Sequence, residues 1–202
     1  RMISAQESLQ RLRDGNRRFV ASLGSGEAQR VVALTQEQSP FAIILGCSDA
    51  RVPAEIVFDQ GLGDLFVIRV AGNVVAPSQV GSVEFAASRF NTRLVVVLGH
   101  SRCGAVLATI EELQRPAENQ SLNLRSIVDR VRPSVEGLMR TELRNDLPTL
   151  IGHAVRSNVR ASVDHLRHGS ALLENLIRHE GLMVVGAEYS LETGVVEFFD
   201  GV

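Results

Sequence analysis

The chain has 202 residues, of which 45% are hydrophobic and 22% charged, and its formal net charge is −2. A chain of this length and composition is typical of one globular domain with a substantial core. The small net charge gives no reason to expect nucleic acid as a partner, and no apolar run reaches the roughly 20 residues of a membrane span. We therefore expect a cytoplasmic protein, or a periplasmic one if a signal peptide preceded Arg1.

The first half of the chain is predicted to begin with a helix and to continue into strands. Residues 4–22 have helical spacing, with Ser4 and Glu7 as a capping box, and we interpret residues 1–35 as an N-terminal helical arm. Apolar runs bounded by glycine or polar residues predict three strands with one helix between them. The expected strands cover 41–46, 64–70 and 93–100, and the helix covers 78–90.

The second half is predicted to be mostly helical and to end in a hairpin. The helices are expected at 103–114, 121–146 and 149–180, with interruptions at Pro133 and Pro148. Residues 181–199 are expected to form two strands around a turn. Strands that alternate with helices predict an α/β fold with a central, mostly parallel sheet flanked by helices. We expect a single domain whose core spans residues 36–202.

Side chains with catalytic or metal-binding chemistry follow two of the predicted strands. Cys47 and Asp49 come directly after the first strand, and His100 and Cys103 follow the third. Open parallel sheets bind ligands beyond the carboxyl ends of their strands. We therefore expect these four side chains to collect at one edge of the sheet.

Cys47, His100 and Cys103 have the residue types that zinc prefers, because zinc binds thiolates and imidazoles in tetrahedral geometry. The His-x-x-Cys spacing spans one turn, so both side chains can reach one ion. Cys103 opens a predicted helix, whose N-terminal dipole favours its thiolate. The sequence thus predicts one zinc ion per chain, with Asp49 or a water molecule as the fourth ligand.

The two cysteines have other interpretations that the sequence leaves open. Free cysteines are often small core hydrophobes, and Cys47 and Cys103 could instead form a disulfide, as in a redox sensor. Neither alternative accounts for His100 or Asp49. A further alternative is a non-catalytic zinc-structured module, in which Asp49 stays on the metal and closes the site.

Asp49 and Arg51 are candidates for catalysis beside the metal. Two thiolates neutralise the charge of Zn²⁺, so water on that ion should be less acidic than water on a zinc held by three imidazoles. A neighbouring carboxylate could accept a hydrogen bond from bound hydroxide, and an arginine fork could hold that carboxylate away from the ion. Asp49 and Arg51 fit these two roles, and the plain alternative is a surface ion pair.

Five blocks of the sequence resemble those of the β-class carbonic anhydrases, in the order of that family: "CSDARVPAE", "FVIRVAGN", "GSVEFA", "VVVLGHSRCGAV" and "VVGAEYSLETGVVEFF". The resemblance implies zinc on Cys47, His100 and Cys103, with Asp49 either on the metal or paired with Arg51. It implies reversible hydration of CO2 to bicarbonate and a proton by zinc-bound hydroxide, which the Asp49–Arg51 dyad orients. Hydrolysis of CS2 or COS is the alternative reaction for such a site.

The resemblance also implies an oligomer and a substrate pocket. The family forms dimers through its amino-terminal helix, and the dimers often pair further, so a homodimer or tetramer is expected. The residues assigned to the CO2 pocket are Gln38, Phe66, Ala71, Gly104 and, on a side where many relatives have tyrosine, Phe85. The other subtype of the family binds regulatory bicarbonate through a tryptophan at the position of Ile44, so we expect no such bicarbonate site here.

Overall fold

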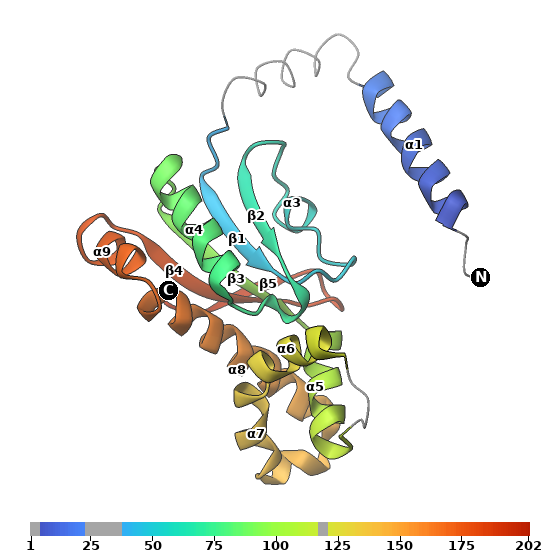
Figure 1. Ribbon diagram of the computed structural model, residues 1–202, viewed down its shortest axis with the longest axis vertical. Helices are drawn as coiled ribbons and strands as arrows, with labels where there is room; N and C mark the ends of the chain where they lie inside the picture. Colours follow the sequence, from blue (N-terminus) through green and yellow to red (C-terminus); the bar gives the residue numbers. More distant parts are fainter. Residues whose placement is uncertain (1–4, 23–37, 117–120) are drawn as a thin grey trace. The chain divides into compact units, whose positions relative to one another are not determined.

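The computed structural model describes residues 5–22, 38–116 and 121–202, which fall into two units, Arg1–Gln38 and Ser39–Val202. The described part of the first unit is mainly helix α1, Ala5–Ser22 (Figure 1). Ion pairs between residues one turn apart, such as Glu7 with Arg11, support this helix. The expected helix is confirmed, whereas its predicted capping residue, Ser4, lies outside the described residues.

The second unit is built on a five-stranded sheet with the order β2-β1-β3-β4-β5. Its strands are β1 (Ala42–Gly46), β2 (Leu65–Arg69), β3 (Leu94–His100), β4 (Met183–Tyr189) and β5 (Val196–Asp200). The first four strands are parallel, and β5 runs antiparallel to β4. The predicted α/β class, with a mostly parallel sheet and a C-terminal hairpin, is confirmed.

Helices connect the strands and cover the sheet (Figure 1). They are α3 (Ala54–Val57), α4 (Pro77–Arg89), α5 (Gly104–Gln114), α6 (Leu122–Val131), α7 (Pro133–Met139), α8 (Leu147–His168) and α9 (Ala171–His179), with short 3-10 turns η1 (Ala71–Asn73) and η2 (Glu142–Asn145). None of the helices in the described ranges combines the length and the apolar character needed to cross a membrane.

The prediction of one helix over 149–180 was wrong in detail. The segment divides into α8 and α9, because the Ser170 hydroxyl accepts a hydrogen bond from the Leu173 amide and starts a new helix after Gly169. Pro148 does not interrupt a helix either, since it lies in the first turn of α8, where its missing N–H costs nothing. The Asp146 side chain caps that first turn.

The hydrophobic core is divided between the two faces of the sheet and its carboxyl edge. Helices α4, α8 and α9 bury one face, where Ile43 and Val97 meet Val83 and Val159. The other face has a smaller cover that includes α3. Helices α5, α6 and α7 gather beyond the carboxyl ends of the parallel strands (Figure 1), and their core includes both cysteines.

Candidate metal centre and active site

The topology creates a crevice between the ends of β1 and β3. These strands are neighbours, but the chain leaves β1 toward β2 on one side and leaves β3 toward β4 on the other. Ligands bind at such a switch point, because the two connections diverge and leave the strand ends open. Gly46 pairs with Leu98, so the residues that follow β1 lie level with the end of β3.

Cys47, His100 and Cys103 meet in this crevice. Their potential ligand atoms all lie within 4.8 Å of one another, and all three residues are buried. Within the described ranges they are the only group of three or more His, Cys, Asp or Glu residues with this geometry. Both cysteines are free thiols, so the predicted ligand cluster is present and the alternative disulfide is not formed.

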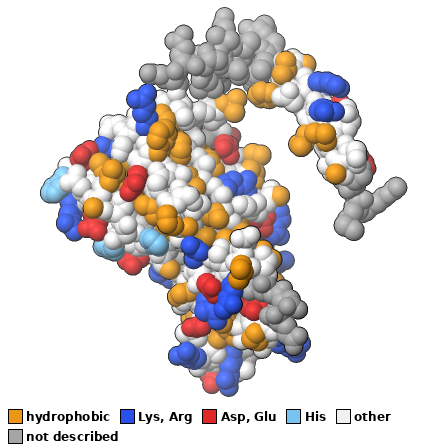
Figure 2. Space-filling model, in the orientation of Figure 1, with side chains coloured by type: hydrophobic (Ala, Val, Ile, Leu, Met, Phe, Trp, Pro, Cys, Tyr) orange, Lys and Arg blue, Asp and Glu red, His pale blue; other side chains and the backbone are white. Residues whose placement is uncertain are grey.

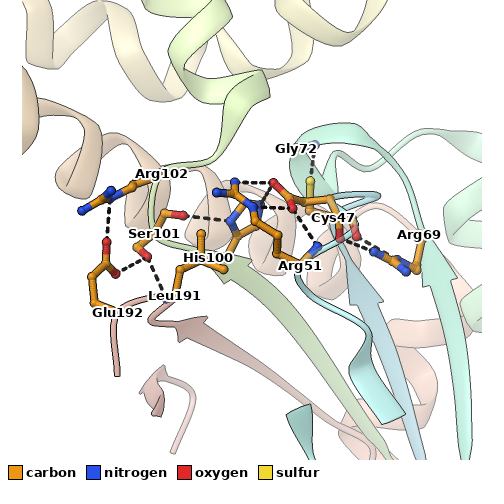
Figure 3. A network of polar contacts seen from close by, with 10 residues as sticks. Cys47, Arg51, Arg69, Gly72, His100, Ser101, Arg102, Leu191 and Glu192 are labelled. Atoms are coloured by element: carbon orange, nitrogen blue, oxygen red, sulfur yellow. Dashed lines mark hydrogen bonds and ion pairs between the residues drawn. The ribbon is translucent and has the colours of Figure 1, made fainter. Parts of the chain in front are cut away.

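His100 is oriented for metal binding. Its side chain is fully buried, and its Nδ1 lies 2.9 Å from the carbonyl oxygen of Ser101 (Figure 3). Its Nε2 has no hydrogen-bond partner within the described part of the chain. If Nδ1 donates its proton to that carbonyl, Nε2 carries the lone pair that a metal needs. A buried imidazole nitrogen left without a partner beside two thiols fits a soft divalent cation such as zinc.

Each of the two cysteines shifts the pKa of the other. Cys103 donates to Cys47 and, despite the opposing effect of burial, lowers the pKa of the Cys47 thiol to about 4, with further help from His100 and the Gly72 amide. The same hydrogen bond and burial raise the pKa of Cys103. Burial alone would lower the pKa of His100, but the Cys47 thiolate and the Ser101 carbonyl raise it overall. The negative charge of the cluster is therefore centred on Cys47.

Asp49 lies beside the cluster and is held by Arg51. The Arg51 side chain donates from Nε to Asp49 Oδ1 at 2.9 Å and from Nη2 to Oδ2 at 2.7 Å, and the Arg51 amide adds a third bond of 2.9 Å. These bonds keep the pKa of the Asp49 carboxyl well below its usual range. Asp49 Oδ2 is 3.8 Å from Nε2 of His100, so an ionised carboxylate sits at the border of the potential metal site.

Backbone contacts fix the loop that carries Cys47 and Asp49. Arg69, at the end of β2, donates to the carbonyl oxygens of Cys47 at 2.9 Å and of Asp49 at 2.5 Å (Figure 3). The amide of Gly72 donates to Cys47 Sγ at 3.3 Å. The backbone of Cys47 and Asp49 is thus tied to the end of β2, and the Cys47 sulfur to the turn that follows it.

A second network holds the loop that carries His100 and Cys103. The Ser101 hydroxyl donates to Glu192 at 2.7 Å and accepts from the Leu191 amide at 3.0 Å (Figure 3). Glu192 also pairs with Arg102 at 2.6 Å. Since Glu192 lies in the turn between β4 and β5, the hairpin braces the ligand loop.

The residues predicted for the substrate pocket fall into three places. Ala71 and Gly104 are exposed. Ala71 precedes Gly72, whose amide contacts Cys47, and Gly104 follows Cys103 of the cluster. Phe66 lies three residues before the end of β2 and packs on Phe85, with ring centroids 6.2 Å apart.

Within this chain the described contacts do not connect the Phe66–Phe85 pair with the metal ligands, so its role in the pocket stays a prediction. Gln38 is exposed and belongs to the first unit, and its role also stays a prediction. Ile44, at the position of the regulatory tryptophan, is buried in β1.

Several residues of the site were not predicted from the sequence. Arg69, Gly72 and Glu192 contact loops that are 20 to 91 positions away along the chain. Their residue types are common in loops and strand ends, and no local spacing marks them. Only the register between β1 and β2 and the position of the β4–β5 turn reveal these contacts.

Comparison with known proteins supports the assignment that this geometry suggests. The family profile described as carbonic anhydrase matches residues 42–196. The carbonic anhydrase of Mycolicibacterium smegmatis is 40% identical over 194 residues, covering 92% of this chain and 89% of the relative. The chain belongs to the carbonic anhydrase family. Carbonic anhydrase 2 of Mycobacterium tuberculosis is also 40% identical, over 189 residues that cover 91% of this chain and 87% of that protein.

Solved structures place the fold in the β class of carbonic anhydrases. The β-carbonic anhydrase CafA of Aspergillus fumigatus superposes with a TM-score of 0.85 at 23% identity, covering 96% of this chain and 92% of that one. A tetrameric β-carbonic anhydrase from Sordaria macrospora superposes with a TM-score of 0.83 at 20% identity, covering 96% and 97%.

Proposed function

We propose that this carbonic anhydrase is a zinc enzyme that interconverts CO2 and bicarbonate. The observation that carries the proposal is the buried set of Cys47, His100 and Cys103, with its ligand atoms within 4.8 Å. Two sulfurs and an imidazole nitrogen are ligands that zinc prefers, and a fourth position would remain for water. When bound, zinc supplies a Lewis acid that lets water act as a nucleophile near neutral pH.

The side chains around the cluster have separate tasks in this reaction. Asp49 is ionised and therefore accepts a hydrogen bond from the attacking water, which directs a lone pair of that water toward CO2. Arg51 holds the carboxylate in place through two parallel bonds.

Gly104 is the first residue of α5, and its amide is one of the N–H groups without a partner inside the helix. That amide is suited to receive the oxygen of CO2 on which negative charge develops.

The test is stopped-flow CO2 hydration on purified protein whose zinc content has been measured. We expect turnover in proportion to zinc, up to one ion per chain, and loss of turnover in Cys47→Ser. CS2 and COS are assayed with the same preparation. A fully zinc-loaded chain that hydrates no CO2 between pH 7 and about 9 would overturn the proposal, and turnover of CS2 or COS alone would reassign the substrate.

We further propose that the enzyme works as a homodimer or a larger even assembly. Hydrophobic side chains reach the surface at several places between charged ones (Figure 2). The less covered face of the sheet holds a pocket of about 180 Å³ that includes Phe41, Phe58 and Phe198, and Phe41 is 57% exposed. The relatives from Sordaria macrospora are tetrameric, which supports assembly.

Sedimentation velocity tests the assembly over a range of protein concentrations. We expect a dimer or tetramer for the whole chain and a smaller species for Phe41→Asp, because a buried carboxylate opposes an apolar contact. Phe41 is chosen because it lies outside the metal cluster. A whole chain that sediments as a monomer at every concentration would refute assembly. The cytoplasmic location stays a prediction.

A further inference from the structure

The turn η1, between β2 and α4, carries the amide that contacts Cys47. Gly72 and Asn73 are both left-handed, with φ of +67° and +44°. Glycine adopts this conformation without a steric penalty and asparagine more readily than most other residues, so the sequence Gly-Asn suits this turn. The Gly72 amide points at Cys47 Sγ from 3.3 Å. The shape of this turn therefore decides whether the sulfur receives a hydrogen bond.

Two buried side chains on α8 hold this turn. Asn158 Nδ2 donates to the carbonyl oxygen of Gly72 at 2.7 Å, and Ser162 Oγ donates to the carbonyl oxygen of Asn73 at 2.9 Å. Asn158 is 2% exposed and Ser162 is 5% exposed. Both bonds satisfy buried carbonyl groups, which cost free energy when left without a partner. Helix α8 thus satisfies two consecutive carbonyl groups of one turn.

The opposite side of the turn is closed by α5. A Cβ on Gly72 would lie 3.0 Å from the Cβ of Ala105, so the backbone is confined between the two helices. The N–H and C=O groups of Gly72 flank the same Cα atom. The carbonyl lies in the peptide plane shared with Asn73 and the amide in the plane shared with Ala71, so the bond to Asn158 restrains ψ of Gly72. With α5 packed on the other side, this restraint limits how far the amide can turn away from Cys47.

We infer that Asn158 is a positioning residue for the metal ligand Cys47, acting through the Gly72 amide. Asn158 touches neither the sulfur nor the place of the substrate. A hydrogen bond from an amide stabilises the negative charge of a thiolate and reduces the electron density that the sulfur donates to a metal. The inference rests on the proposed metal centre, since it assigns Asn158 to one of its ligands.

The variants Asn158→Ala and Ser162→Ala test this inference as a matched pair. Each removes one buried donor from the same helix and leaves one carbonyl of the same turn without its partner. Only Asn158→Ala removes the side-chain bond to Gly72, whose amide faces the sulfur. If Asn158→Ala does not fold, Asn158→Ser replaces it, because the serine hydroxyl is one bond shorter and cannot reach the Gly72 carbonyl.

The measurements use cobalt(II) as a coloured substitute for zinc. We expect the thiolate-to-cobalt charge-transfer band of Asn158→Ala to move to lower energy, because a sulfur without its hydrogen bond holds its electrons less tightly. The metal affinity should fall about tenfold, as is usual for a partner of a metal ligand. Ser162→Ala should keep the wild-type band and lose less than about threefold in affinity.

Two results would overturn the inference, and they are distinguishable. If the wild-type chain binds cobalt and zinc but both variants have its unshifted band, Asn158 is structural only and the proposed function survives. If the wild-type chain binds neither metal, the proposed metal centre fails and this inference fails with it.

Discussion

Replacing Arg51 by alanine probes how the carboxylate beside the ligands is controlled. The substitution removes both side-chain bonds to Asp49, of 2.9 and 2.7 Å, and leaves only the bond from the backbone amide of residue 51. Asp49 Oδ2 already lies 3.8 Å from His100 Nε2. Two ligand atoms on one tetrahedral zinc are about 3.3 Å apart, so the freed carboxylate needs to approach by only about half an ångström to become a ligand.

We expect Arg51→Ala to keep its zinc and to lose turnover of CO2 by roughly 100-fold, the upper end of the usual effect for a residue that orients a group beside a metal. Asp49 would occupy the position that water needs. Arg51→Lys should recover only part of the activity, because an ammonium lacks the planar fork that holds both carboxylate oxygens. The assay is kcat/KM for CO2 hydration from stopped-flow traces, normalised to zinc content.

A matched control is available on α9. Arg178→Ala breaks an exposed ion pair of the same kind, with Glu174 at 2.8 Å, and should leave kcat/KM unchanged. An Arg51→Ala enzyme with activity within about twofold of the wild type would show that Arg51 does not hold the carboxylate off the metal. The carbonic anhydrase assignment would stand, but the task given to Arg51 would be wrong.

Three further predictions concern the metal and the stability of the fold. His100→Ala should lose its metal on dialysis while its far-UV circular dichroism is kept, and retained stoichiometric zinc would contradict the ligand set. Gly99→Ala should lower the free energy of unfolding by about 1–3 kcal/mol, because its Cβ would lie 2.5 Å from Val159 Cγ2. The control Gly81→Ala has open space for its Cβ and should raise the free energy of unfolding by about 0.5–1 kcal/mol. Urea titrations measure both changes. A hydrogen bond from the Thr149 hydroxyl is the main cause of the lowered pKa of Asp146 in the folded chain. The ionised carboxylate therefore stabilises the fold above the pKa that Asp146 has in the unfolded chain, about 4, and this effect is lost as the pH falls through the folded-state pKa. Asp146→Ala should therefore lower Tm by about 3 °C at neutral pH, a difference that should shrink below pH 4, and a difference independent of pH would contradict this sign.

The sequence was sufficient to predict the strands and the cluster of Cys47, His100 and Cys103. Buried parallel strands are continuous apolar runs, and glycine ends the run at Gly46, so their carboxyl ends can be located from the residues alone. Because parallel strands end at the same edge of a sheet, Cys47 and His100 were predicted to meet, and the structure brings them together. Their close approach also requires β1 and β3 to be neighbours, and this strand order came from the structure.

The partners of these ligands could not be predicted in the same way. In the sequence, nothing distinguishes Asn158 from other polar residues of a helix. Its contact with Gly72 joins residues 86 positions apart along the chain. Such contacts depend on the crossing of α8 over the sheet, which hydrophobic spacing does not specify. The break between α8 and α9 was missed for a related reason, since Ser170 acts as a cap only where the chain turns.

The close approach of α8 to the sheet links the packing of the core with the geometry of the ligands. Val159 of α8 packs directly against two glycines of the sheet, Gly99 and Gly186. A Cβ atom would lie 2.5 Å from a Val159 methyl group at Gly99 and 2.9 Å from one at Gly186. Asn158, the residue before Val159, can reach η1 only because these glycines let the helix sit this close. A Cβ at Gly99 would push α8 outward and lengthen the 2.7 Å bond from Asn158 to Gly72. Gly99, directly before His100, therefore controls how closely α8 approaches the sheet. Through Asn158 and Gly72, that approach affects the hydrogen bond to Cys47.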